Sequence, residues 1–235
     1  MKQFITLLLF FGFVTKAHAE KILVIGDSIS CTAFGAELVD ALTKKNHEVT
    51  LLCAISSKAE HWVKGQKPSG QICHTRSVEK KTFIPCEPKG QMPIFTALLE
   101  KHKDSKVIVA LGTNSLQGTQ ADSYYRQMAE ALKNNDCEWI SPPHLNPMEA
   151  KGFSPALLTK MEKNLDPFYA SLEASVSPFC KLIDSRPMTR PGTMGNKTKD
   201  GMHANEVGAA HWVKEILKQT HPIRTQPALS KPANK

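Results

Sequence analysis

The chain has 235 residues, 41% of them hydrophobic and 22% charged, with a formal net charge of +8. This length is enough to bury the core of one domain, and no composition change divides it into two. The positive charge is typical of a solvated surface and could also attract an anionic envelope polymer. No nucleic-acid-binding motif accompanies the charge, so we expect no nucleic-acid partner.

Residues 1 to 19 have the pattern of a secretory signal peptide. Lys2 precedes an apolar stretch over residues 4 to 14, and Ala17-His18-Ala19 forms a small-x-small cleavage site. That stretch is too short for a comfortable membrane span, and no later segment approaches the roughly 20 apolar residues that a span requires. We expect cleavage after Ala19, a periplasmic or secreted protein, and no stable membrane insertion.

Short β-branched runs alternate with longer helical patterns, which predicts strand-helix units around a parallel sheet. The expected strands are Lys21 to Gly26, Glu48 to Ala54, Lys106 to Leu111, Cys137 to Ile140 and Lys181 to Asp184. The expected helices are Ala33 to Lys45, Ile94 to His102, Ala121 to Asn134, Pro155 to Val176 and Ala204 to Gln219. Residues 56 to 92 form a long polar connection, which is more typical of a functional or disordered segment than of a routine connector. From residue 221 the chain is rich in proline and poor in apolar residues, which predicts a disordered tail.

All six cysteines follow the expected cleavage site, and an even number in an exported chain favours disulfides. Cys73 and Cys86 flank the polar connection and would staple it. Cys137 and Cys180 begin neighbouring strands and could bridge them. Metal binding is the weaker interpretation, because no close Cys and His spacing occurs.

The first strand ends in Gly26-Asp27-Ser28. A glycine permits a sharp turn off the strand, and Ser28 then precedes a helix, whose amino end favours negative charge. By itself this pattern is more often a turn with a capping serine than a catalytic site.

Two further motifs follow later strands. The third strand ends in Gly112-Thr113-Asn114, where an asparagine either closes a turn or directs its amide at an oxyanion. After the fifth strand, Asp200 and His203 stand three residues apart, just before the last helix. A serine hydroxyl is a poor nucleophile near neutral pH and needs a histidine to accept its proton and a third group to orient that histidine.

Together, in this order and each after a strand, these motifs resemble the SGNH/GDSL hydrolase family over nearly the whole mature chain. The resemblance implies one domain over residues 20 to 220, with a three-layer α/β/α, flavodoxin-like fold and a five-stranded parallel sheet. It implies Ser28 as nucleophile, His203 as general base and acid, and Asp200 as its orienter. It also implies an oxyanion hole formed by the Ser28 amide, an amide after the second strand, and Asn114. No metal or organic cofactor is required.

The sequence departs from the family at one point of that hole. The family usually has a glycine after the second strand, whereas this chain reads Ile55-Ser56-Ser57-Lys58. Ser57 is our choice for the matching position, with Ser56 as the alternative. A backbone donor survives any side chain that permits the required conformation, so activity is not excluded.

Trp62 and His144 follow the second and fourth strands, in loops that border the substrate pocket in the family, and we consider both as substrate contacts. The leading hypothesis is an exported serine esterase that removes acyl groups, foremost acetyl, from a carbohydrate or cell-envelope polymer or a small ester. A lipase or thioesterase of the same family is the nearest alternative. The alternative from a second class of function is a catalytically weak module that binds glycans or transfers acyl groups.

Overall fold

The computed structural model describes residues 19 to 77, 82 to 87 and 90 to 220. All but the last residue of the expected signal peptide, and the whole of the expected disordered tail, lie outside these residues. Within the described ranges, no helix is both long and apolar enough to cross a membrane.

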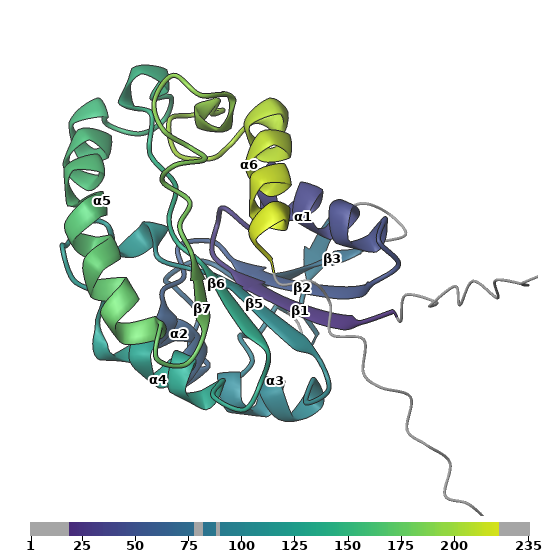
Figure 1. The fold of residues 1–235 in the computed structure, drawn as a ribbon. Helices are drawn as coiled ribbons and strands as arrows, with labels where there is room; N and C mark the ends of the chain where they lie inside the picture. Colours follow the sequence, from purple (N-terminus) through teal and green to yellow (C-terminus); the bar gives the residue numbers. More distant parts are fainter. Residues whose placement is uncertain (1–18, 78–81, 88–89, 221–235) are drawn as a thin grey trace, which may run out of the picture.

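A seven-stranded sheet forms the centre of the fold, in the order β4-β3-β2-β1-β5-β6-β7 (Figure 1). Five of its strands are parallel: β1 (Lys21–Gly26), β2 (Glu48–Ala54), β5 (Lys106–Ala110), β6 (Cys137–Ile140) and β7 (Lys181–Ile183). These are the five predicted strands, two of them one residue shorter than expected. Their order is that of a flavodoxin-like sheet, in which ligands bind where the strand order reverses, at the carboxyl ends of β1 and β5.

The prediction of a five-stranded sheet missed an antiparallel hairpin at one edge. It consists of β3 (Cys73–Ser77) and β4 (Thr82–Pro85), and β3 pairs antiparallel with β2. The hairpin lies inside the segment that the sequence presents as a polar connection. Strand β3 is mostly polar and β4 has only four residues, which are largely exposed, so the hydrophobic pattern of a strand is weak there.

Helices cover both faces of the sheet, as expected for three layers. Helices α1 and α6 pack together on one face, while α2 to α5 lie on the other (Figure 1). Their bounds are α1 (Ala33–Thr43), α2 (Ala59–Lys64), α3 (Phe95–Lys101), α4 (Ser123–Ala131), α5 (Pro155–Val176) and α6 (Glu206–Gln219), with short 3-10 turns η1 (Thr113–Ser115), η2 (Pro147–Glu149) and η3 (Met194–Asn196). The six-residue helix α2 was not predicted from the sequence.

The central strands have continuous apolar runs because both of their faces are covered. Leu23, Val24 and Ile25 of β1 are fully buried, as are Val107 and Val109 of β5. Such strands are typical of parallel sheets between two helical layers. The buried core therefore determines where these strands end. The polar motifs follow the strands, so the core also determines where those motifs lie.

Three disulfides pair all six cysteines. The Cys73–Cys86 and Cys137–Cys180 bridges confirm the two predicted pairs: the first closes the edge hairpin and the second joins β6 to the residue before β7. The third pair, Cys31–Cys53, links the turn after β1 to β2 and was not predicted. Three disulfides fit an exported protein, because they persist in oxidising compartments.

Candidate active site

The turn that carries Ser28 leaves β1 at Gly26, where only a glycine fits. A Cβ atom at this position would lie 1.9 Å from the Ser30 hydroxyl and 3.2 Å from the carbonyl oxygen of Ala110. Ser28 follows two residues later and is 6% exposed. Helix α1 begins only at Ala33, so a short turn separates the serine from the helix.

Asp27 ties this turn to the end of β5. Its amide donates to the carbonyl oxygen of Ala110 (3.3 Å), and its buried carboxylate accepts the Ile29 amide (3.0 Å). Burial raises the pKa of Asp27 to about 7, although hydrogen bonds from the backbone of Ile29, Gly112 and Thr113 oppose the shift. The residue before Ser28 is therefore a buried acid held by two neighbouring turns.

The turn after β2 contains both serines considered for the oxyanion hole. The Ser57 amide donates to the carbonyl oxygen of Ala54 (3.1 Å), which closes the turn. Ser56 has a φ of 62°, in the left-handed region that favours glycine. Of the two serines, Ser56 thus has the backbone conformation that favours glycine, while the Ser57 amide is bonded within the turn.

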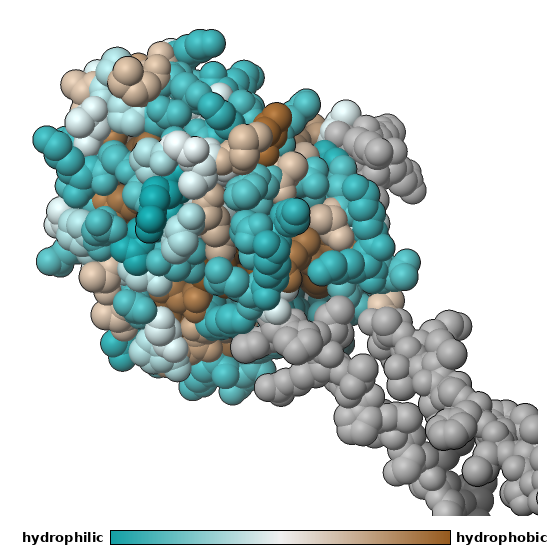
Figure 2. Space-filling model, turned by 45° about the horizontal axis from the view of Figure 1, so that its top comes forward, coloured by the Kyte–Doolittle hydropathy of each residue, from teal (hydrophilic) through white to brown (hydrophobic). Residues whose placement is uncertain are grey.

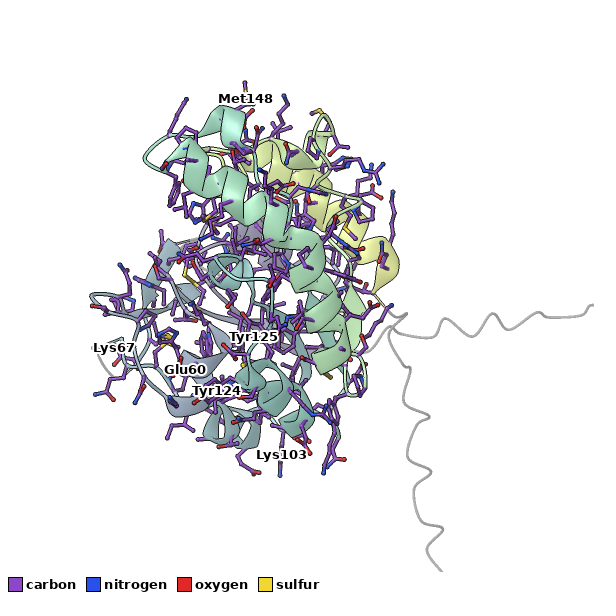
Figure 3. All side chains as sticks on the ribbon, turned by 90° about the vertical axis from the view of Figure 1, so that its left-hand side faces the viewer. Glu60, Lys67, Lys103, Tyr124, Tyr125 and Met148 are labelled. Carbon is purple, nitrogen blue, oxygen red and sulfur yellow. A yellow bond between two sulfur atoms is a disulfide. The ribbon has the colours of Figure 1, made fainter. Side chains whose placement is uncertain are left out.

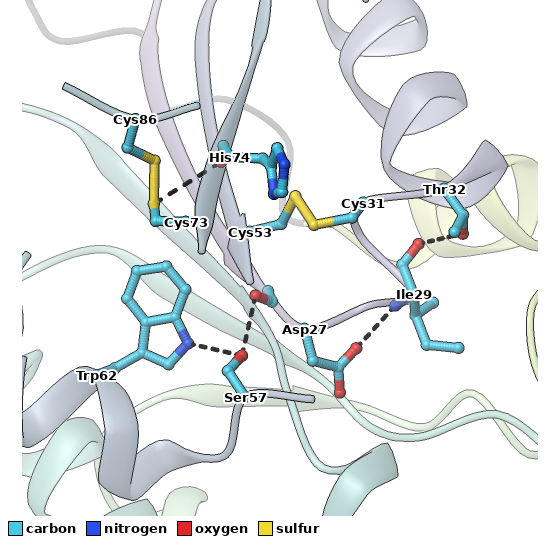
Figure 4. Close-up of a disulfide and its surroundings, with 11 residues drawn as sticks. Asp27, Ile29, Cys31, Thr32, Cys53, Ser57, Trp62, Cys73, His74 and Cys86 are labelled. Carbon is cyan, nitrogen blue, oxygen red and sulfur yellow. Dashed lines mark hydrogen bonds between the residues drawn. A yellow bond between two sulfur atoms is a disulfide. The ribbon is translucent and has the colours of Figure 1, made fainter. Parts of the chain in front are cut away.

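Ser57 points its side chain into the core, where it is fully buried. Its hydroxyl accepts the indole N–H of Trp62 (3.2 Å) and lies 3.5 Å from the carbonyl oxygen of Gly26 (Figure 4). Trp62 is itself fully buried. In this structure Trp62 supports the turn from the core side and has no exposed surface for a substrate.

Asn114 lies in η1, which follows Gly112, two residues beyond the end of β5. Gly112 adopts a φ of 141°, and a Cβ there would come within 2.7 Å of the Pro142 ring. The Asn114 side-chain amide donates to the carbonyl oxygen of Ser57 (3.0 Å). Asn114 is therefore joined to the turn after β2 by its side chain.

Asp200 and His203 form a tight pair before α6. One carboxylate oxygen of Asp200 is 2.8 Å from Nδ1 of His203, and the other accepts the backbone amides of Met202 (3.1 Å) and His203 (2.8 Å). Burial raises the pKa of Asp200, but the hydrogen bonds from His203 and Met202 outweigh it and leave the pKa below its usual value. The carboxylate is thus held ionised beside the imidazole.

The other ring nitrogen of His203, Nε2, is buried and accepts or donates no hydrogen bond within the part of the chain that the structure describes. This nitrogen would receive a proton from Ser28, and the structure places no hydrogen bond between them. Catalytic hydrogen bonds often form only when substrate is bound.

A cavity of about 850 Å³ opens beside the pair. Asp200 and His203 line it, as do Cys31, Thr32 and Ala33, which follow the turn that carries Ser28. The cavity therefore connects the segment after Ser28 with the Asp200–His203 pair. The sequence alone did not indicate that Cys31 lines this space.

His144 makes a second histidine–carboxylate contact, with Glu162 of α5. Its Nδ1 contacts one Glu162 oxygen, the other oxygen accepts the Leu145 amide (2.7 Å), and the His144 amide donates to Thr189 (2.9 Å). His144 does not line the cavity beside His203. Within the described ranges, no group of three or more His, Cys, Asp or Glu side chains could hold a metal ion.

The sequence matches no known protein-family profile and no curated protein. Solved structures do resemble this fold. Est24, a carbohydrate acetylesterase from Sinorhizobium meliloti, aligns over 85% of this chain and 97% of its own, with a TM-score of 0.53 and 12% identity. The extracellular lipase from Streptomyces rimosus covers 86% and 100% at a TM-score of 0.52 and 10% identity. Phospholipase A1 from Streptomyces albidoflavus NA297 covers 87% and 100% at a TM-score of 0.54 and 8% identity.

This chain has the SGNH hydrolase fold. At such low identities the similarity concerns the fold alone.

Proposed function

We propose that this protein is a serine esterase in which Ser28, His203 and Asp200 act as nucleophile, general base and orienting acid. The main support for the proposal is the Asp200–His203 pair. Asp200 contacts Nδ1 of His203, and Nε2 of His203 is buried and free to accept a proton. The pair borders the same cavity as the segment that follows Ser28. The shared fold with esterases and lipases supports the same reaction class.

In this mechanism the Ser28 Oγ attacks the ester carbonyl carbon while its proton passes to Nε2 of His203. The carbonyl π electrons move to oxygen and give a tetrahedral oxyanion, and Asp200 stabilises the imidazolium. Collapse of the intermediate breaks the bond to the alcohol, which takes the proton from His203. Water then attacks the acyl-enzyme by the same steps and restores Ser28.

The oxyanion would be stabilised by donors from three turns. These are the backbone amide of Ser28, an amide of the turn after β2, and the side chain of Asn114. Because the Ser57 amide is bonded to Ala54 and Ser56 has the left-handed backbone, we assign the second donor to Ser56 in place of Ser57. Such preorganised donors are usually the largest single contribution to acyl-transfer catalysis.

For the substrate we propose an acyl ester, foremost an acetyl ester, of a carbohydrate or envelope polymer outside the cytoplasm. The three disulfides fit an exported enzyme. The face of the molecule in Figure 2 is largely hydrophilic, and its apolar side chains form small separate patches. A largely polar molecular surface suits a carbohydrate better than an aggregated lipid.

The first experiment is hydrolysis of p-nitrophenyl acetate by residues 20 to 235 with disulfides formed, beside Ser28→Ala. We expect turnover that falls by several orders of magnitude in the variant. Equal rates in the two proteins would refute the assignment of Ser28. A chain-length series of esters then separates acetylesterase from lipase, since a preference for acyl chains beyond about eight carbons would favour the lipase.

A further inference from the structure

Residues 144 to 154, the later part of the connection between β6 and α5, run along the turn that carries Asp200 and His203. We refer to these residues as the β6–α5 segment and to the turn as the catalytic turn. The Asn146 amide donates to the carbonyl oxygen of Gly201 (2.7 Å), and the Lys151 amide donates to that of Asp200 (3.2 Å). A Cβ atom on Gly201 would approach the Asn146 oxygen to 2.7 Å. The segment and the catalytic turn are therefore packed closely against each other.

One side chain of this segment, Glu149, reaches the base of the catalytic turn. A single oxygen of its carboxylate accepts both the backbone amide (2.8 Å) and the hydroxyl (2.6 Å) of Thr198. These bonds are charge-assisted and so stronger than neutral hydrogen bonds. The neighbouring Met148 side chain is 94% exposed and lies at one end of the molecule (Figure 3).

Thr198 in turn is bonded to the residues of the catalytic turn. Its hydroxyl accepts the Gly201 amide (3.0 Å), and its backbone forms an antiparallel bridge with Ala204. Within that bridge the Lys199 amide donates to the carbonyl oxygen of His203 (2.8 Å). Thr198 thus sets the start of a small hairpin whose tip holds Asp200 and whose return carries His203.

We propose that Glu149 is a positioning residue for the Asp200–His203 pair, acting through Thr198. Glu149 does not line the cavity beside His203. Its carboxylate fixes Thr198, and Thr198 fixes the hairpin on which the carboxylate of Asp200 meets Nδ1 of His203. The hydrogen bonds from Thr198 hold the pKa of Glu149 below its usual value, against the opposing effect of burial, so the carboxylate is ionised at the pH of an esterase assay. This inference rests on the proposed function of the pair.

The kinetic test compares Glu149→Ala with Glu149→Gln. We expect alanine to lower kcat by about 10-fold or more with little change in KM, because a small misplacement of a catalytic group is costly. Glutamine keeps one oxygen acceptor for Thr198 and should restore most of the rate. Glu60→Ala serves as the matched control, because it removes an exposed carboxylate bonded to Lys64 on α2.

A double-mutant cycle tests whether Glu149 acts through Thr198. Thr198→Val removes the hydroxyl and should lower kcat as Glu149→Ala does, and the two changes together should cost little more than either alone. Additive losses would overturn the proposed route. If Glu149→Ala does not fold, the comparison of Thr198→Val with Thr198→Ser, which keeps the hydroxyl, decides the same point.

A second readout is independent of turnover. In a Ser28→Ala background, the proton on Nδ1 of His203, which bonds to Asp200, is followed by proton NMR. Glu149→Ala should weaken or broaden this signal, because a loosened Asp200 holds the proton less firmly. An unchanged signal in folded protein would overturn the positioning role, even if the protein proved to hydrolyse no ester.

Discussion

Asn114 donates its side-chain amide to the backbone oxygen of Ser57 across 3.0 Å and so joins the turn after β5 to the turn after β2. A side-chain amide has two N–H groups, and this contact uses one of them. The second can point at an oxyanion while the first holds the direction of the side chain. The contact therefore both fixes a donor and couples two of the three turns at the site.

Replacing Asn114 tests this dual role. We expect Asn114→Ala to lower kcat by about 10² to 10³-fold, the usual cost of losing one oxyanion donor. Asn164→Ala is the control, because it removes a similar bond, from Asn164 to the carbonyl oxygen of Leu116. Comparable kinetics for the two variants in ester hydrolysis would contradict the role of Asn114.

Glycine substitutions distinguish the two serines after β2. Ser56→Gly relieves a left-handed backbone at a non-glycine residue and should keep activity, with a stability change between zero and a gain of about 1 kcal/mol. Ser57→Gly deprives the buried indole N–H of Trp62 of its acceptor and should cost about 1 to 3 kcal/mol. Urea unfolding together with ester hydrolysis measures both effects. The assignment of Ser56 fails if Ser56→Gly, well folded, is inactive.

Asp27 should make the stability of the fold depend on pH. Its pKa in the folded protein is raised to about 7, above its value of about 3.9 in an unfolded chain. The folded protein therefore binds this proton more tightly, so the stabilisation is fully present below about pH 4 and is lost as the pH rises toward 7. The loss is at most about 4 kcal/mol.

The measurement is the free energy of unfolding of the wild type and of Asp27→Asn between pH 4 and 7.5. The neutral asparagine should flatten the decline, while all other titrating groups stay common to both proteins. Parallel curves would show that Asp27 does not titrate in this interval.

The Cys31–Cys53 bridge should matter more for activity than for stability. It encloses a shorter loop than Cys137–Cys180, with sequence separations of 22 and 43, so in the chain-entropy account its loss costs less stability. Yet it joins the turn after Ser28 to the end of β2, next to the candidate oxyanion turn. We compare the double alanine variant at Cys31 and Cys53 with the one at Cys137 and Cys180. The first should show the larger decrease in kcat, and the second the larger decrease in melting temperature. The opposite order would contradict this role.

The sequence determined the five parallel strands and the ends at which they place Ser28, Asn114 and the Asp200–His203 pair. Continuous apolar runs mark strands that are buried on both faces, and polar motifs that follow such strands meet at one edge of a parallel sheet. Local spacing also determined the contact within Asp200-x-x-His203, because three residues suffice to bring these side chains together.

Only the tertiary structure decided the rest, because it depends on contacts between segments far apart in the chain. The edge hairpin has a short and weak strand pattern in sequence, and it is held in place by pairing with β2 and by the Cys73–Cys86 bridge. The turn after β2 takes its shape from the core, where Trp62 engages Ser57 and leaves the left-handed position to Ser56. Likewise Glu149 stands 49 residues before Thr198, and no sequence pattern relates them. The sequence thus supplied the proposed reacting groups, whereas long-range packing decided how each group is held.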